Sequence, residues 1–348
     1  MFRTHGRPSM VDGHVDMSFR ETQNWLSFNE DAKNFAFIDE GSRALVFNLI
    51  LIGDEAVGPG IFVTAAAPGL EIPKEMRAVA HAHGCDNWRI SLLGDFHMGP
   101  EEYGPGEYRL QEGWRVYPED DQSYGPDGGW QVVFMADRRG LKRRLAVEPP
   151  QGVVYPEELV APKIAEKFEF NCDLVSDDPA MTAGPTAIAS TIGPPGHAKL
   201  RMGKLNGSFA DSDKWSAVAP ATRMAVTLLG NKDKGPVLVF VHTEASEVAA
   251  PRSRVPTELY RLVVEGSCRI GGKIYEKGDM RIQEAGMWCE PVEALEGGLK
   301  ELLIFGDRNG LEAIETTGEG WPRALPAVVA ELGRALDLRT QPKSLPVS

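Results

Sequence analysis

The chain has 348 residues, of which 42% are hydrophobic and 25% are charged, so its length suits about two globular domains and its composition is that of folded proteins. With 37 basic and 50 acidic residues the formal net charge is −13, which argues against non-specific binding to nucleic acid or to an anionic membrane. No apolar run reaches the roughly 18 residues of a membrane span, and residues 1–20 hold no apolar stretch of signal-peptide length. We therefore expect a cytoplasmic protein.

The cysteines are Cys85, Cys172, Cys268 and Cys289. They lie far apart in the sequence and form no CxxC motif. This pattern argues against a zinc ribbon or a disulfide scaffold and fits a reducing compartment.

Strand-like runs dominate the chain. They are rich in Val, Ile, Leu and Phe and are bounded by Gly, Pro, Asn and Asp, which is typical of β-strands separated by turns. One segment, 321–338, has apolar residues at helical spacing. No helical pattern lies between the strands, so an all-parallel α/β fold is excluded and we predict an all-β protein with a short C-terminal helix. Strands are expected at 43–52, 60–66, 88–93, 130–136, 223–229, 236–242, 259–264 and 300–305.

The most informative feature is an internal repeat. YGPGEYRLQEGWRVYP (103–118) matches YEKGDMRIQEAGMWCEP (275–291), with Tyr, Gly, an acid, Arg, Gln, Glu and Pro recurring in order. VFMADRRGL (133–141) matches LIFGDRNGL (303–311), and GPGIFV (58–63) loosely resembles GPVLVF (235–240). Two homologous β modules in one chain are therefore predicted.

The repeat suggests a division of the chain into five parts. Residues 1–24 form an N-terminal segment, and residues 25–150 form the first module. A connecting segment over 151–205 precedes the second module at 206–315, and residues 316–348 hold the helix and tail.

The sequence from His81 to Gly94, HAHGCDNWRISLLG, carries a family resemblance. It resembles the first motif of the cupin superfamily, in which HxH is followed by a Glu and then a Gly, with Asn87 standing where the Glu would be. The run 103–118 resembles the second motif, but Val116 stands where its His is expected. Together with the repeat, the chain resembles a bicupin with degenerate metal-binding motifs.

The resemblance implies two tandem jelly-roll β-barrels and a divalent metal held inside a barrel. His81 and His83 are two residues apart, so on a strand they would share one face and could bind one Fe, Mn, Zn, Ni or Cu ion. Asn87 has the same parity, and His97 is a candidate third imidazole. The alternative is that these residues are remnants in a polar pocket or a surface loop.

The second module lacks a corresponding ligand set. At the equivalent positions it has Ser253, Val255, Leu259 and Cys289. We therefore interpret the second barrel as structural, or as a binding barrel without metal.

Five further residues are candidates for contacts to substrate. Arg89, Arg109 and Gln111 recur in the second module, which also fits a role in the fold. Trp114 and Tyr117 could line an apolar mouth, although core packing is the commoner use of such aromatic residues.

The sequence leaves two functions open. The first is a metal-dependent bicupin enzyme that acts on a small organic molecule in the N-terminal barrel, a dioxygenase being one form and an isomerase or lyase another. The second is a non-catalytic cupin that binds a small-molecule ligand or serves in assembly. A homodimer formed through exposed strand edges is also expected, with no nucleic-acid or membrane partner.

Overall fold

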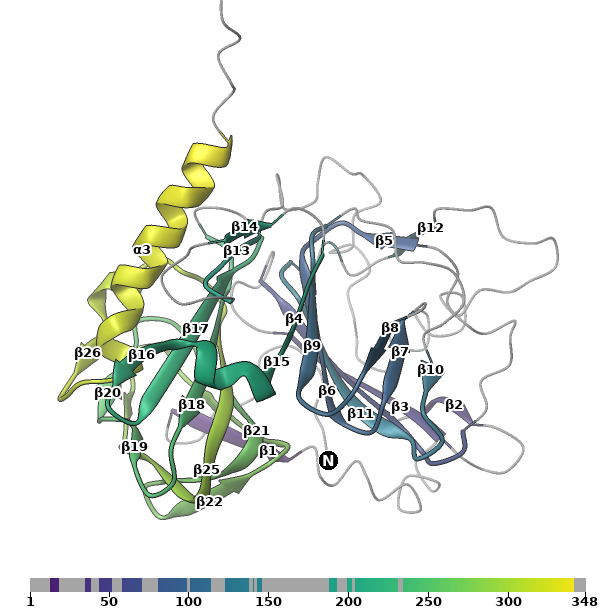
Figure 1. Cartoon of the computed structure of the whole chain (residues 1–348), viewed down its shortest axis with the longest axis horizontal. Helices are drawn as coiled ribbons and strands as arrows, with labels where there is room; N and C mark the ends of the chain where they lie inside the picture. Colours follow the sequence, from purple (N-terminus) through teal and green to yellow (C-terminus); the bar gives the residue numbers. More distant parts are fainter. Residues whose placement is uncertain are drawn as a thin grey trace, which may run out of the picture.

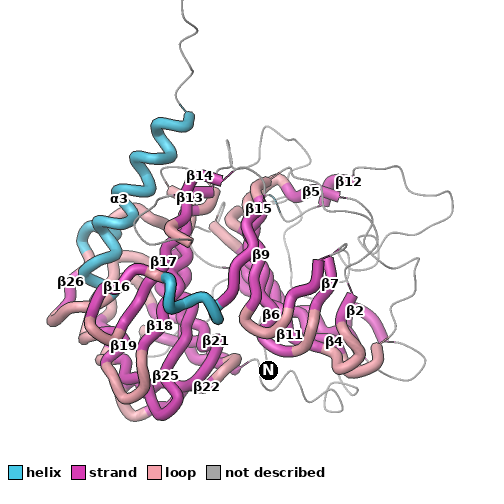
Figure 2. The backbone as a smooth tube through the Cα atoms, viewed as in Figure 1, coloured by secondary structure: helices cyan, strands magenta, loops and turns pink. Residues whose placement is uncertain are grey.

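The computed structural model contains two β modules that lie side by side, and strands make up most of both (Figures 1 and 2). The long helix α3 (Trp321–Thr340) runs along the outer side of the second module and confirms the helix predicted over 321–338. No helix among the described residues is long and apolar enough to cross a membrane. The structure describes residues 13–18, 35–38, 44–51, 58–70, 81–98, 101–113, 123–137, 140, 143–145, 188–192, 199–201, 204–230 and 234–340.

The N-terminal module is built on an antiparallel sheet in the order β15-β9-β6-β11-β4-β3-β2. A smaller sheet, β10-β7-β8, lies across from it, and β5 pairs with β12. The main strands are β15 (Lys204–Ser208), β9 (Glu107–Gln111), β6 (Asn87–Leu93), β11 (Gly129–Met135), β4 (Gly60–Ala66), β3 (Ala44–Leu51) and β2 (Phe35–Ile38). The others are β10 (Ser123–Tyr124), β7 (Phe96–Met98), β8 (Glu101–Tyr103), β5 (His81–His83) and β12 (Arg143–Leu145).

The C-terminal module is built on a sheet in the order β1-β23-β21-β25-β18-β17-β13-β14, with β22, β19 and β16 paired to β21, β25 and β17. The strands of the main sheet, in this order, are β1 (His14–Ser18), β23 (Asp279–Gln283), β21 (Leu259–Ile270), β25 (Val292–Phe305), β18 (Val237–Thr243), β17 (Thr222–Leu228), β13 (Ile188–Ser190) and β14 (Lys199–Arg201). The strands paired to this path are β22 (Lys273–Glu276), β19 (Val248–Ala250) and β16 (Ser216–Ala219). A small separate sheet consists of β24 (Trp288–Cys289), β20 (Ser253–Arg254) and β26 (Glu315–Thr316). Short 3-10 turns are η7 (Phe209–Lys214) and η8 (Leu311–Ala313).

The two main sheets repeat the same strand order, because β9-β6-β11-β4-β3 corresponds to β23-β21-β25-β18-β17. The pairing registers also agree. Arg89 faces Arg109 across β6 and β9, and Arg261 faces Arg281 across β21 and β23. Since a slip of one residue would turn every side chain to the other face, matched registers mean that equivalent residues point the same way in both modules. The repeat found in the sequence is therefore present in the strand pairing.

The modules exchange their outermost strands. β1, from the start of the chain, pairs with β23 of the C-terminal module, and β15, which follows β14 of that module along the chain, pairs with β9 of the N-terminal one. Figure 1 shows β1 in its N-terminal colour among the green C-terminal strands, and β15 beside β9. Each main sheet is thus completed by a strand that lies outside the run of chain forming the rest of it.

The modules pack on each other through equivalent faces of their main sheets. One apolar cluster joins Trp88, Ile90 and Tyr108 of the first module to Tyr260 and Leu262 of the second, all fully buried. Phe240 stacks on Tyr108 with ring centroids 5.0 Å apart. Burial of aromatic surface on both sheets makes this a continuous core rather than a mobile junction between domains.

A second apolar cluster fills the C-terminal module and is closed by α3. Trp321, Leu325, Leu332 and Leu336, at helical spacing, are buried against it. The predicted fold class, all-β with a C-terminal helix, is confirmed.

Candidate functional site

The inner face of each main sheet is defined as the face that points away from the other module. In the N-terminal module much of this face is polar, although Val133 and Met135 of β11 are buried on it as well. It carries six described side chains that are buried or nearly so and come from β6, β9 and β11: Asn87, Arg89, Ser91, Arg109, Gln111 and Gln131. Thr64 of β4 pairs with Gln131 and belongs to the same face.

The corresponding face of the C-terminal module is apolar at three of these positions. Asn87, Ser91 and Thr64 are replaced there by three buried apolar residues that belong to the cluster closed by α3, namely Leu259, Val263 and Val241. Since equivalent backbone positions carry different chemistry, the fold does not require polar groups on this face. Buried polar groups cost free energy unless they are hydrogen-bonded, which indicates that the N-terminal module keeps them for another reason.

The small sheet of the N-terminal module reaches onto this inner face. The Tyr124 hydroxyl lies 2.5 Å from Thr64 Oγ1, and the Arg89 guanidinium lies 5.3 Å from the centroid of the Phe96 ring. Burial raises the pKa of Tyr124 to about 12, against the opposing effects of Thr64 and Arg89. The phenol therefore stays protonated at neutral pH and can donate a hydrogen bond.

Arg109 lies at the centre of a polar network at the β9 side of this face. Its Nη1 donates to Glu101 Oε2 at 3.1 Å, and its Nη2 donates to Gln111 Oε1. The Tyr103 hydroxyl donates to Glu101 Oε2 at 2.8 Å, and Asn206 Oδ1 lies 3.2 Å from the same hydroxyl oxygen. Burial, followed by the hydrogen bond to Glu101, raises the pKa of Tyr103 to about 12. The exchanged strand β15 thus contributes to the site through Asn206.

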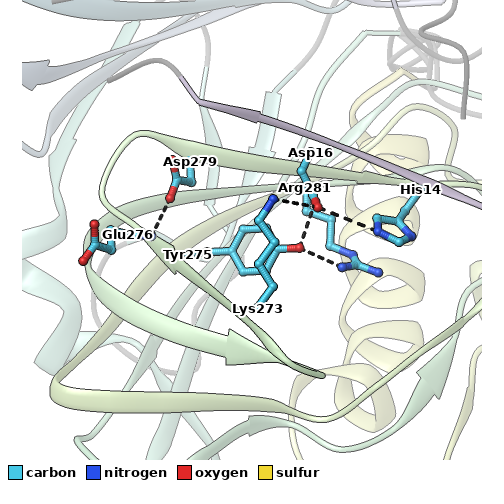
Figure 3. A network of polar contacts seen from close by, with 7 residues as sticks. All are labelled: His14, Asp16, Lys273, Tyr275, Glu276, Asp279 and Arg281. Atoms are coloured by element: carbon cyan, nitrogen blue, oxygen red, sulfur yellow. Dashed lines mark hydrogen bonds and ion pairs between the residues drawn. The ribbon is translucent and has the colours of Figure 1, made fainter. Parts of the chain in front are cut away.

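The C-terminal module contains the same network with its charges rearranged (Figure 3). Tyr275, equivalent to Tyr103, donates to Asp16 Oδ1 at 2.8 Å and accepts from Arg281 Nη1 at 2.7 Å. Lys273, equivalent to Glu101, donates to Asp16 at 3.0 Å. The carboxylate lies on β8 in the first module, where it accepts from Arg109, and on the exchanged strand β1 in the second, where it accepts from Lys273.

A second difference between the modules concerns a buried ion pair. Arg261 Nη1 donates to the carboxylate of Glu301, and both side chains are almost completely buried. Burial raises the pKa of Glu301, and the Arg261 guanidinium opposes that effect. At the equivalent position of β11 the N-terminal module has the neutral Gln131, which is 3% exposed.

The four candidate metal ligands come from three different strands. His81 and His83 lie on β5, which pairs with β12 outside the main sheet. His83 is buried and its Nδ1 lies 3.2 Å from the Gly140 carbonyl oxygen. Asn87 begins β6 in the main sheet, and His97 lies on β7, paired with Ser123 and Glu102.

A mononuclear site of the kind that the resemblance implies needs at least three strong donors. Among the described residues no three His, Cys, Asp or Glu side chains come together closely enough to hold a metal ion. The described donors therefore do not by themselves complete a divalent-metal site. The side chain of His81 lies outside what the structure describes.

Three of the five candidate substrate contacts, Arg89, Arg109 and Gln111, lie together on the inner face of the N-terminal module. Trp114 and Tyr117 fall outside the described residues. Four residues of this face and its network were not predicted from the sequence: Thr64, Ser91, Gln131 and Asn206. For the first three, a signal was present in the difference between the two repeats. The N-terminal module has a neutral polar residue at each of these positions, where the C-terminal module has an apolar or acidic one.

Comparison with known proteins gives similarity of structure only, because no family model and no curated protein matches the sequence. A provisionally named dioxygenase from Nostoc punctiforme is 9% identical, with a TM-score of 0.48, over 90% of this chain and 92% of that one. Salicylate 1,2-dioxygenase from Pseudoaminobacter salicylatoxidans, solved with gentisate, is 13% identical with a TM-score of 0.48, over 90% and 87%. Oxalate decarboxylase from Bacillus subtilis is 13% identical with a TM-score of 0.43, over 89% and 81%.

The duplicated strand order, together with the matched registers, decides the architecture. The fold is a tandem repeat of one antiparallel β module, arranged as in a bicupin. The N-terminal module has the more polar inner face, and the apolar cluster of the C-terminal module is closed by α3. The site that differs from the shared fold, and that could hold a ligand, therefore belongs to the N-terminal module.

Proposed function

We propose that this bicupin binds a small polar organic molecule at the inner face of its N-terminal module, and that the C-terminal module is structural. The observation that carries the proposal is the replacement of Leu259, Val263 and Val241 by Asn87, Ser91 and Thr64 at equivalent buried positions.

The chemistry of this face supports recognition of a polar ligand. It offers hydroxyl, amide and guanidinium donors within one patch of sheet, and a few convergent polar groups on a rigid framework are what fix the orientation of a bound small molecule. These side chains project from strands whose other face is buried in the core between the modules. The donors are therefore held in place before a ligand arrives, which reduces the ordering cost of binding.

The test is a screen of polar fragments against the full-length protein by ligand-observed NMR, with calorimetry on the hits. In Ser91→Val, which gives the N-terminal module the residue of its partner module, hits should lose at least about tenfold in affinity because a buried hydroxyl is removed. That hydroxyl donates its proton to the Gly94 carbonyl oxygen at 2.6 Å, so toward a ligand it acts as an acceptor. The matched control is the reverse change, Val263→Ser, which should leave affinity within about twofold since the sites are independent.

Two results would contradict the proposal. One is a screen with no hit that binds in a 1:1 ratio. The other is a set of hits whose affinity falls equally in Ser91→Val and Val263→Ser, because binding would then not distinguish the modules.

Metal-dependent catalysis at the N-terminal module, with a dioxygenase as one form, is the second candidate function. One observation favours it. The Nδ1 of His83 faces the Gly140 carbonyl, so a proton held there would leave Nε2 with the lone pair that a metal requires.

Metal content of the untagged protein, purified without chelator, tests this second candidate. About one equivalent of Fe, Mn, Zn, Ni or Cu that disappears in the His81→Ala/His83→Ala double variant would support it. A protein that holds no metal and gains none on dialysis against these ions would remove the candidate and leave the binding function in place.

A further inference from the structure

Three basic residues lie side by side on neighbouring strands of the C-terminal module. Arg223 of β17 is the cross-strand partner of His242 on β18, and His242 is the partner of Lys300 on β25. Residues paired in this way on antiparallel strands point to the same face, with Cβ atoms about 5 Å apart. All three side chains are partly buried. These three residues are called the basic row.

The basic row lies at the margin of the core between the modules. Two residues along each strand, the same face carries Ala225, Phe240 and Leu302, which are fully buried in that core. The three bases keep some exposure to solvent, unlike these neighbours. The basic row therefore occupies the place where this face of the sheet leaves the core and meets water.

The equivalent positions of the N-terminal module carry no base. The registers match His242 with Ala65 and Lys300 with Trp130, and the partner of Ala65 on β3 is Val46. Ala65 and Trp130 are buried in the core between the modules. The shared fold therefore does not require basic residues here, and the C-terminal module has them for a reason of its own.

The acidic groups of the protein balance this row only in part. Like charges on directly opposite residues destabilise a sheet. Lys300 Nζ donates to Glu265 Oε2 at 2.9 Å, but that carboxylate is 60% exposed, and such an ion pair contributes little. Arg223 makes no ion pair within the described part of the chain, and its Nη1 donates to the Trp215 carbonyl oxygen at 3.4 Å.

The imidazole in the middle of the row is held through one of its nitrogens. Nδ1 of His242 lies 2.9 Å from Oγ of Ser212, which is buried in η7. Nε2 has no hydrogen-bond partner among the residues that the structure describes. Burial, followed by Lys300, lowers the pKa of His242, and Arg223 acts in the same direction. The ring is therefore oriented and neutral at pH 7, and its second nitrogen is available.

Other charged groups near the row do not reverse this balance. Glu244 and Glu265 act to raise the pKa of His242, but its pKa is lowered overall. The turn η7, which contacts the row through Ser212, carries three further charged and exposed residues, of which the first and last pair with each other: Asp211, Asp213 and Lys214.

We propose that the basic row binds a tetrahedral oxyanion, a phosphate or sulfate group, with Arg223, His242 Nε2 and Lys300 as donors. Three donors from three strands suit an anion with at least three oxygen atoms, whereas a carboxylate has two. The anion would offset the like charges that the sheet brings together. This site is separate from the inner face of the N-terminal module, so it stands independently of the binding function proposed above and gives the C-terminal module a role beyond support.

The test follows the His242 imidazole by NMR in the full-length protein, with its signal assigned by comparison with His242→Gln. Sulfate is the first probe because it stays a dianion over the whole pH range, and sodium chloride keeps the ionic strength constant. About 20 mM sulfate should raise the pKa of His242 by about 0.5 or more, since a bound anion favours the protonated ring.

The decisive variant is Arg223→Gln, which removes one donor of the row. It should bind sulfate at least about tenfold more weakly than wild type and lose the rise in the pKa of His242. The matched control is Arg269→Gln, which removes an exposed arginine of the same module that pairs with Glu293. Its affinity for sulfate should stay within about twofold of wild type.

Three further probes define the ligand class. Inorganic phosphate should compete with sulfate, and acetate should bind at least about tenfold more weakly. Methyl phosphate that binds as tightly as inorganic phosphate would support a site for the phosphate group of a larger molecule. Weaker binding of methyl phosphate would support a site for the free oxyanion.

Three outcomes would overturn the proposal. In wild type, sulfate and phosphate that leave the His242 signal and its pKa unchanged do so without recourse to any variant. A rise in the pKa that is equal in Arg223→Gln and Arg269→Gln would show that Arg223 is not a donor. Acetate that acts as strongly as sulfate would show a general effect of anions rather than a site for a tetrahedral one.

Discussion

Gly94 and Gly266 are equivalent residues that meet the same obstacle in the two modules. Both have positive φ, 68° and 75°. A Cβ built on Gly94 would lie 2.1 Å from the carbonyl oxygen of Gly128, and one built on Gly266 would lie 2.1 Å from that of Gly298. The duplication therefore preserves a close backbone approach that only glycine allows.

The first prediction follows from this contact. Gly94→Ala and Gly266→Ala should each lower the free energy of unfolding by more than about 1 kcal/mol, because the backbone must move and φ is unfavourable for Ala. Gly272→Ala is the control, since its Cβ would meet nothing within 4 Å. Denaturant titrations would measure all three, and a neutral Gly94→Ala would show that the turn can relax.

The second prediction concerns the strand that the N-terminus contributes to the C-terminal module. Asp16→Ala removes the acceptor shared by Tyr275 and Lys273 and should lower the free energy of unfolding by about 1–3 kcal/mol. The control is Glu293→Ala, which breaks the exposed pair with Arg269 and should cost less than about 1 kcal/mol. Equal effects of the two variants in denaturant titrations would contradict a role for Asp16 in holding β1.

The third prediction concerns the buried ion pair. Glu301→Gln leaves Arg261 charged and buried, and should lower the free energy of unfolding by about 3–5 kcal/mol. The double variant Arg261→Met/Glu301→Leu removes both charges inside an apolar cluster and should recover most of that loss. Thermal and denaturant unfolding of the two variants provide the measurement. If the double variant is as unstable as Glu301→Gln, the pair does more than satisfy its own charges.

The fourth prediction concerns pH. Partial burial, followed by the nearby Lys300, lowers the pKa of His242 below its ordinary 6.5, and its Nδ1 lies 2.9 Å from Ser212 Oγ. The folded protein thus binds the proton less tightly than the unfolded chain does. His242 therefore contributes to the stability of the fold above pH 6.5, and this contribution is lost as the pH falls below that value. The melting temperature of His242→Gln should therefore fall less than that of wild type on acidification. An equal fall in both proteins would show that His242 is not a source of the pH dependence.

Much of the fold could be predicted from the sequence because it rests on local and repeated patterns. All eight expected strands are present, although β21 and β25 extend well beyond 259–264 and 300–305. They continue because the residues after Gly266 pair again with β25 beyond an irregularity in the register. The repeat also anticipated the strand pairing, since matching residues such as Arg109 and Arg281 occupy matching positions in the sheet.

The exchange of β1 and β15 could not be predicted in the same way. HVDMS and KLNGS are short and resemble no part of the repeat, and the alternation of HVDMS rests on two apolar residues only, Val15 and Met17. Which sheet edge each strand joins is a long-range property of the packed modules. The homodimer and the cytoplasmic location stay predictions, which light scattering and cell fractionation would test.

The metal site stays a prediction. His81 and His83 lie on β5, which pairs with β12, and the side chain of His81 lies outside the described residues. Arg89, Arg109 and Gln111 do lie together on the inner face. The differences between the repeats, with Gln131 against Glu301, identify this face without any metal motif.

The exchange of outer strands also constrains how the polypeptide acquires its structure during synthesis. His14 leaves the ribosome 269 residues before its partner Gln283, and Gln111 must wait for Lys204. Contacts so distant in sequence form slowly, because the entropy of closing long loops is lost before they contribute. A nascent chain released early would therefore leave two sheets with unpaired edges, the condition in which β proteins aggregate.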